Sequence, residues 1–275
     1  MSKIPEDAIQ CLDKGFVRLV DSMGGDEAIV QAARVSYGKG TTKLSQDRGL
    51  IRYLMRHRHT TPFEMVEFKF HCKMPIFVAR QWVRHRTANI NEYSLRYSEA
   101  RDEFYYPEPE HIQFQSSLNK QGRMGNVPDD LKKRVQDYFK EISNRSFEIY
   151  SELNTAGVSR ELARAILPVN LYTEWYWKND LHNLLHFVGL RSDSHAQYEI
   201  RVFSDAMADS VKAVAPFAWE AYQDYAVSGL RFSKIEQGLL EQNLPARVID
   251  DIIEDVVYQI TATLHHNKPR QENEI

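Results

Sequence analysis

The segment 63–73 reads Phe-Glu-Met-Val-Glu-Phe-Lys-Phe-His-Cys-Lys, and its apolar and polar residues alternate from Val66 to Lys73. A period of two separates the two kinds of side chain onto opposite faces, so the segment predicts a strand with one buried face. Pro75 follows at a position that favours the first turn of a helix, and Ile76–Arg84 is expected to continue that helix. The polar segment that comes next is expected to be extended or looped.

That polar segment, 84–96, reads Arg-His-Arg-Thr-Ala-Asn-Ile-Asn-Glu-Tyr-Ser-Leu-Arg and contains no lysine. Arginine suits bidentate recognition of phosphate and other planar oxyanions, so the segment predicts a site for an anionic ligand. The alternative is a polar loop held by its own hydrogen bonds. Ser94 is expected to hydrogen-bond and not to act as a nucleophile, because it has no Gly-x-Ser-x-Gly elbow and no identifiable base.

Composition limits the classes of function. The chain has 275 residues, 43% of them hydrophobic, and a net charge of −3. This charge argues against a general nucleic-acid binder, which carries a basic excess, and suits a small anionic ligand at a local positive patch. No apolar run spans a bilayer, residues 1–7 hold no signal-peptide centre, and the 2 cysteines make no disulfide framework. We therefore expect a cytoplasmic protein that does not contact a membrane.

Periodicity and turn residues predict the remaining elements. Strands are expected at 16–23 and 171–177, and 103–126 is expected to be a polar surface excursion. Asp26 is expected to cap the first of a series of helices at 26–35, 45–57, 128–153, 160–167, 179–190, 195–214 and 216–227. The expected fold class is α+β, with one mixed helix-and-sheet domain over 1–227 and a helical C-terminal extension over 228–275. Within the extension, helical stretches are expected at 235–242 and 246–265.

The histidines offer a second candidate site. His182 and His186 are four residues apart, so they share one face of a helix. Together with His195 they could form a three-histidine metal site, although the metalloprotease pattern is absent because no Glu follows the first histidine. A structural role and cofactor binding are the alternatives. We expect no metal ligand among them.

Three separate segments resemble one protein family. Arg-His-Arg at 84–86, followed after seven residues by Ser94, is similar to the signature of flavin-dependent thymidylate synthases. The flanking segment 75–82 and the segments 164–173 and 190–200 resemble that family too, in the same order along the chain. The likeness covers roughly residues 15 to 227.

The resemblance implies an activity. It implies that the chain methylates deoxyuridylate (dUMP) to thymidylate (dTMP), with methylenetetrahydrofolate as the one-carbon donor. It also implies FAD as the cofactor that carries the hydride, NADPH as its reductant, and a homotetramer whose subunits meet at the site. No Gly-x-Gly-x-x-Gly segment or phosphate-binding loop is present, so a dinucleotide would bind without those devices.

The resemblance also implies roles for individual residues. Arg191 would favour the ionised pyrimidine and is the expected catalytic residue. The residues that would bind dUMP are Gln81, Arg84, Glu92, Ser94, Leu95, Arg96, Arg164 and Arg191. Those that would bind FAD are Ser36, His59, Thr61, Arg84, His85, Arg86, Glu92, Asp180, His182 and His186.

Two rival functions remain open at the level of sequence. A non-catalytic nucleotide- or RNA-binding protein could use the same arginines, and a metal-dependent hydrolase could use the three histidines. Flavin absorbance in the purified protein would separate both from the enzyme.

Overall fold

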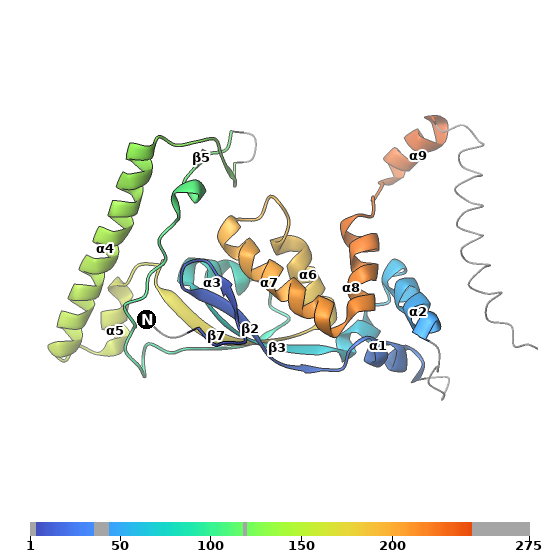
Figure 1. Ribbon diagram of the computed structural model, residues 1–275, viewed down its shortest axis with the longest axis horizontal. Coiled ribbons are helices and arrows are strands. Elements are labelled where there is room, and N and C mark those ends of the chain that lie inside the picture. The colour runs from blue at the N-terminus through green and yellow to red at the C-terminus, as the bar shows by residue number, and fades with distance from the viewer. Residues whose placement is uncertain (1–3, 36–43, 118–119, 244–275) are drawn as a thin grey trace, which may run out of the picture. The chain divides into compact units, whose positions relative to one another are not determined.

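The computed structural model describes residues 4–35, 44–117 and 120–243 (Figure 1). The chain divides after Tyr222 into two units, 1–222 and 223–275. The first unit contains both helices and a sheet, which confirms the α+β class. None of the helices in the described part of the chain is both long enough and apolar enough to cross a membrane.

A five-stranded sheet organises the first unit. Its strands lie in the order β1 (Ile9–Cys11), β2 (Gly15–Met23), β3 (Glu67–Pro75), β7 (Tyr172–Asp180) and β4 (Asn89–Glu92). Every neighbouring pair is antiparallel. Strand β3 lies in the centre, between β2 and β7, although almost 100 residues of sequence separate it from β7. The polar segment that follows the helix predicted at 76–84 contributes the edge strand, β4.

The predicted alternation in β3 is confirmed on its apolar face and wrong at one position of its polar face. Phe68, Phe70 and Cys72 are fully buried. Lys73, expected on the polar face, is buried as well, with its Nζ 2.7 Å from Oε2 of Glu103. The strand is also shorter than predicted at its start, because 61–65 forms a short 3₁₀ helix that leads into it.

Three helices cover the buried face of the sheet. They are α3 (Ile76–Trp82), α6 (Leu181–Arg191) and α7 (Tyr198–Val214). Pro75 is the last strand residue and precedes α3, so the predicted helix begins one residue later than expected and ends near Trp82. The indole of Trp82 is fully buried and meets a ring from each of the other two helices, at 4.9 Å from Phe187 and 6.0 Å from Phe203. This aromatic cluster holds the ends of α3 and α6 together.

The capping role predicted for Asp26 is wrong. Asp26 is the first residue of α1 (Asp26–Ala33), and Gly25 precedes it as the cap. Its carboxylate instead accepts hydrogen bonds from the backbone N–H groups of Phe217 and Ala218, at 2.8 and 2.9 Å. It thus satisfies the N-terminus of a helix almost 200 residues away, α8 (Pro216–Tyr222). The helix α2 (Leu44–Arg56) completes this end of the unit.

The segment 103–126 is only partly the surface excursion that its composition predicts. Phe104 and Tyr105 are buried, and Phe104 forms a bridge with Leu171. The rest contains a short helix, Pro109–His111, and two small paired strands, β5 (Phe114–Gln115) and β6 (Arg123–Met124). Proline and glycine mark the turns correctly, but the aromatic pair that precedes them belongs to the core.

The remaining helices match their predicted positions within a few residues. α4 (Asp129–Thr155) packs through Tyr150 on Phe104, and α5 (Arg160–Ala163) continues as a 3₁₀ turn, Arg164–Ile166. Helix α6 begins two residues later than expected, because β7 extends to Asp180. The second unit contains a π-helical turn, Gln223–Val227, and α9 (Lys234–Asn243). The helix expected at 246–265 lies outside the described residues.

Candidate active site

The ends of α3 and α6 bring three of the expected residues into contact. Arg191, the last residue of α6, donates from Nε to Nε2 of His85 at 3.0 Å. It also donates from Nη2 to the main-chain carbonyl of Gln81 at 3.3 Å. Gln81 lies in the last turn of α3, where carbonyl groups lack a partner within the helix, so a cation is favoured there. These two bonds leave further N–H groups of the guanidinium available to a ligand.

The electrostatics of this contact favour a neutral His85. Burial, followed in size by the charges of the neighbouring Arg191 and His186, lowers the pKa of His85 to about 4. The rings of His85 and His186 lie 5.9 Å apart, and the edge of His85 meets Phe187 at 4.9 Å. Burial also lowers the pKa of Arg191, but a guanidinium keeps its charge at any working pH. The site therefore pairs a cation with an uncharged imidazole.

A second group of expected residues forms a turn beside α5. The backbone N–H of Arg96 donates to Oγ of Ser94 at 3.3 Å, and the carbonyl of Ser94 accepts from the backbone of Tyr97 at 3.2 Å. The guanidinium of Arg96 lies 3.2 Å from the carboxylate of Glu161, and both side chains are more than half exposed. Arg164 lies in the 3₁₀ turn that directly follows α5. Arg96 is thus presented at an exposed turn that is paired with α5, and Arg164, which is half-buried, follows α5.

Leu95 and Glu92 tie this turn to the fold. Leu95 packs against the core cluster that contains Phe104 and Tyr150. The carboxylate of Glu92, at the end of β4, accepts from Oγ1 of Thr173 in β7 at 2.7 Å. The side chains of Arg84 and Arg86 are exposed just beyond α3. The signature segment therefore alternates between anchored residues and exposed arginines.

Apart from those in the signature segment, the described residues expected at the flavin lie in two places. His59 and Thr61 are exposed at the start of the 3₁₀ helix that precedes β3, where His59 joins a cluster of rings with Tyr53 and His57. His182 and His186 lie on α6, and Ser36 lies outside the described residues. Asp180 caps α6: its Oδ1 accepts from the backbone N–H of Asn183 at 2.9 Å, and its Oδ2 accepts from the side chain of the same residue at 2.7 Å.

The third histidine of the possible metal site is engaged elsewhere. His195 lies 2.8 Å from the carboxylate of Asp193, to which its own backbone N–H also donates. Within 4–35, 44–117 and 120–243, no group of three or more His, Cys, Asp or Glu side chains is arranged to hold a metal ion.

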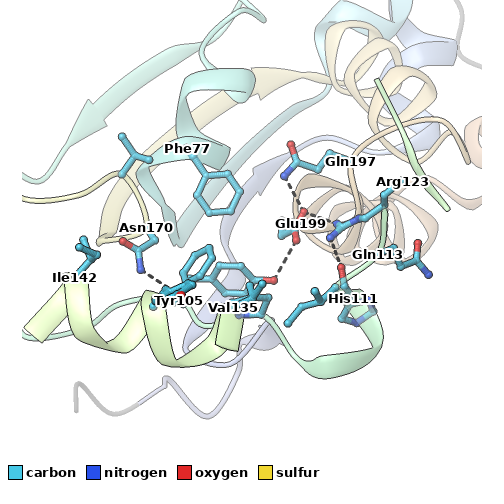
Figure 2. A pocket seen from close by; sticks show the side chains of 15 residues that line it. Phe77, Tyr105, His111, Gln113, Arg123, Val135, Ile142, Asn170, Gln197 and Glu199 are labelled. Atoms are coloured by element: carbon cyan, nitrogen blue, oxygen red, sulfur yellow. Dashed lines mark hydrogen bonds and ion pairs between the residues drawn. The ribbon is translucent and has the colours of Figure 1, made fainter. Parts of the chain in front are cut away.

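A cavity of about 600 Å³ is lined in part by Gln197, the hydrogen-bond partner of Gln81, and its polar residues were not predicted as site residues. Phe77 of α3, Val135 and Ile142 of α4, and Tyr105 form its apolar walls. Its polar end contains Arg123, Gln197 and Glu199, which are joined by hydrogen bonds (Figure 2). Gln197 and Glu199 lie in one of the segments that carry the family resemblance, but nothing in their spacing predicts that Gln197 meets Gln81.

Comparison with known proteins gives the family. The family model described as "Thymidylate synthase complementing protein" matches residues 18–217. A flavin-dependent thymidylate synthase of Ehrlichia ruminantium (strain Gardel) is 58% identical over 223 residues, which are 81% of this chain and 75% of that protein. One of Rickettsia bellii (strain RML369-C) is 53% identical over 247 residues, covering 85% and 84%.

A solved structure agrees with these relatives. The UMP/dUMP methylase PolB from Streptomyces cacaoi, bound with 5-Br dUMP, superposes with a TM-score of 0.72 at 33% identity. The match covers 79% of this chain and 98% of that one. Fold and relatives thus define a nucleotide-methylating class of enzyme. The chain belongs to the flavin-dependent thymidylate synthase family, which confirms the resemblance found in its sequence.

Proposed function

We propose that this enzyme methylates dUMP to dTMP with methylenetetrahydrofolate as the one-carbon donor, FAD as the hydride carrier and NADPH as the reductant. The contact among Arg191, His85 and Gln81 is the observation that carries the proposal, because it presents a fixed cation where a pyrimidine can develop negative charge. Stacking base and flavin at reacting distance uses binding energy, and the cofactor supplies the redox chemistry.

The nucleotide is assigned to the two groups of residues at the signature segment. Arg96 and Arg164, with Ser94 and Leu95 from the same turn, are proposed to bind the phosphate end of dUMP. Arg is suited to this because its planar donors match phosphate oxygens. Gln81, Arg84 and Glu92 are proposed to complete the nucleotide site, and the neighbour PolB, bound to 5-Br dUMP, supports a nucleotide at this fold.

Arg191 is proposed as the catalytic residue. Its guanidinium would favour the pyrimidine ionised at the nitrogen between the two carbonyls, and it would do so without giving up a proton. Neutral His85 assists, because it accepts a hydrogen bond from Nε and thereby fixes the plane of the guanidinium. A charged imidazole at the same place would repel it.

The residues proposed for FAD fit an anionic, aromatic cofactor. Arg84 and Arg86 supply cations for a pyrophosphate, and His85, His182 and His186 supply ring nitrogens for hydrogen bonds. His59 is exposed beside other aromatic rings, and Thr61 is exposed close to it in sequence. Asp180 orders this region, since its carboxylate caps α6 two residues before His182. Glu92 and Ser36 complete the proposed set.

The assembly, domain division and location are proposals as well. We propose a homotetramer, because the expected ligand groups lie on exposed turns and need walls from a neighbouring subunit. We propose that 1–227 is the catalytic domain and 228–275 an added helical extension. A cytoplasmic location without a nucleic-acid partner is consistent with a biosynthetic enzyme of net charge −3.

Three measurements on one preparation test the proposed function. The absorbance spectrum should show a bound flavin, the solution mass should be that of a tetramer, and dTMP should form only when dUMP, methylenetetrahydrofolate and NADPH are all present. A colourless protein that binds nucleotide or RNA without turnover would replace the proposal by the non-catalytic alternative. An active monomer would contradict the shared site.

A further inference from the structure

A buried carboxylate at the start of α7 has no part in the chemistry described so far. Glu199 is 3% exposed, and its two oxygens receive three hydrogen bonds (Figure 2). Oη of Tyr105 donates to Oε1 at 3.1 Å, while Nη2 of Arg123 and Nε2 of Gln197 donate to Oε2 at 2.7 and 2.8 Å. Burial opposes ionisation of Glu199, but the bonds from Arg123 and Gln197 outweigh it and lower the pKa of the carboxyl.

This carboxylate begins a chain of hydrogen bonds that reaches the nucleotide site. Glu199 orients the amide of Gln197, whose Oε1 accepts a hydrogen bond from Nε2 of Gln81. The main-chain carbonyl of Gln81 accepts from Arg191, which in turn donates to His85. Gln81 therefore connects two networks: its side chain is held from α7, and its backbone is held from α6.

We propose that Glu199 and Gln197 are positioning residues that fix the side-chain amide of Gln81 for dUMP. The proposal rests on the proposed function, because Gln81 is assigned there to the nucleotide.

The physical reason lies in the freedom of a glutamine. Ordering such a long side chain costs rotamer entropy. An amide can also turn over and exchange its donor for its acceptor. A donated bond to Gln197 removes both freedoms before the nucleotide arrives. The carboxylate is the suitable anchor, because the N–H of Gln197 can donate to it while its own negative charge is balanced by Arg123.

The first test substitutes Gln197→Met, which keeps the length of an exposed side chain and removes both of its hydrogen bonds. We expect the KM and the calorimetric Kd for dUMP to rise about three- to tenfold, the range for one lost hydrogen bond. The kcat at saturating dUMP should stay within about twofold, because Arg191 is held by the backbone of Gln81 and not by its side chain. The melting temperature should not change. Unchanged KM and Kd would overturn the proposal.

Tyr105→Phe is the matched control. It removes a bond to the same carboxylate but leaves the bonds from Arg123 and Gln197 in place. We expect a lower melting temperature and an unchanged KM for dUMP, the reverse of the pattern for Gln197→Met. If Tyr105→Phe raises the KM as much as Gln197→Met does, the network acts through stability alone and the proposal is wrong.

Glu199→Gln and a double-mutant cycle test the chain itself. Glu199→Gln keeps the shape of the side chain and removes its charge. It should raise the KM for dUMP and also lower the melting temperature. A lower melting temperature with an unchanged KM would remove Glu199 from the proposal. The effects of Gln81→Met and Gln197→Met on the binding free energy of dUMP should be non-additive, since each substitution breaks the same contact. If the unaltered holoenzyme neither binds dUMP nor forms dTMP, the proposed function has failed. If it does both and the variants behave additively, only the positioning proposal has failed.

Discussion

Arg191 donates from Nε to Nε2 of His85 across 3.0 Å, so the imidazole must accept at Nε2 and carry its single proton on Nδ1. The same contact joins the end of α6 to the residues that follow α3. It couples a residue of the Arg-His-Arg segment to one that is 106 positions later in the chain. The protonation state of His85 therefore decides whether Arg191 keeps its place.

A first prediction concerns stability and pH. The pKa of His85 is lowered from 6.5 to about 4 in the folded chain, so between these values the unfolded chain binds more protons. The contribution of neutral His85 to the free energy of unfolding is therefore fully present above about pH 6.5, and it is lost as the pH falls toward 4. His85→Gln keeps an acceptor that does not titrate, so its melting temperature should fall less than that of the unaltered protein between pH 7.5 and 5. If the melting temperatures of the two proteins fall equally over this pH range, His85 is not the source of the pH dependence.

A second prediction separates charge from geometry at Arg191. Arg191→Lys keeps a cation but loses the planar fork that reaches both His85 and Gln81, so it should restore only part of the activity lost in Arg191→Ala. The readout is single-turnover flavin oxidation after reduced enzyme is mixed with saturating dUMP and methylenetetrahydrofolate. Flavin reduction by NADPH should suffer less. Wild-type oxidation rates in Arg191→Ala would make Arg191 a binding residue only.

A third prediction concerns the exposed turn. Arg96→Ala should weaken dUMP binding about ten- to hundredfold, since a charge-assisted hydrogen bond contributes roughly 1.5–3 kcal/mol, and flavin binding should change far less. Glu161→Gln is the control, because it removes the ion pair of Arg96 and leaves the arginine in place. Titration should show no loss of dUMP affinity in that variant. A loss equal to that of Arg96→Ala would mean that the ion pair, and not the arginine, shapes the turn.

A fourth prediction concerns the buried pair in the sheet. The side chains of Lys73 and Glu103 are 2% and 5% exposed and lie 2.7 Å apart. Lys73→Met should lower the free energy of unfolding by about 3–5 kcal/mol, because it removes the cation that lies 2.7 Å from a buried carboxylate. The double variant Lys73→Met with Glu103→Leu should be more stable than Lys73→Met alone. Urea denaturation measures both, and a double variant that is less stable than either single variant would contradict the argument.

Local pattern was sufficient to predict much of this fold. The alternation at 66–73 predicts β3, and the spacing of apolar residues predicts α2, α4 and α7 within a few residues. The burial of Cys72 follows from the same alternation. These features depend on neighbours within one or two turns or on one face of one strand, and a sequence contains that information directly. The signature segment predicted the family for a similar reason, since its residue types and spacing are themselves local.

The tertiary structure alone decided which distant residues meet. Nothing near Lys73 in the sequence indicates that Glu103 will neutralise it, and nothing near Asp26 indicates that it will cap a helix at Phe217. Likewise, the sequence predicted Gln81, His85 and Arg191 as candidates, but only the packing of α3, α6 and α7 joined them to Gln197 and Glu199. The physical reason is that a buried charge or an unpaired helix end requires a partner in space. Which residue supplies that partner depends on how antiparallel strands and helices from opposite parts of the chain pack together.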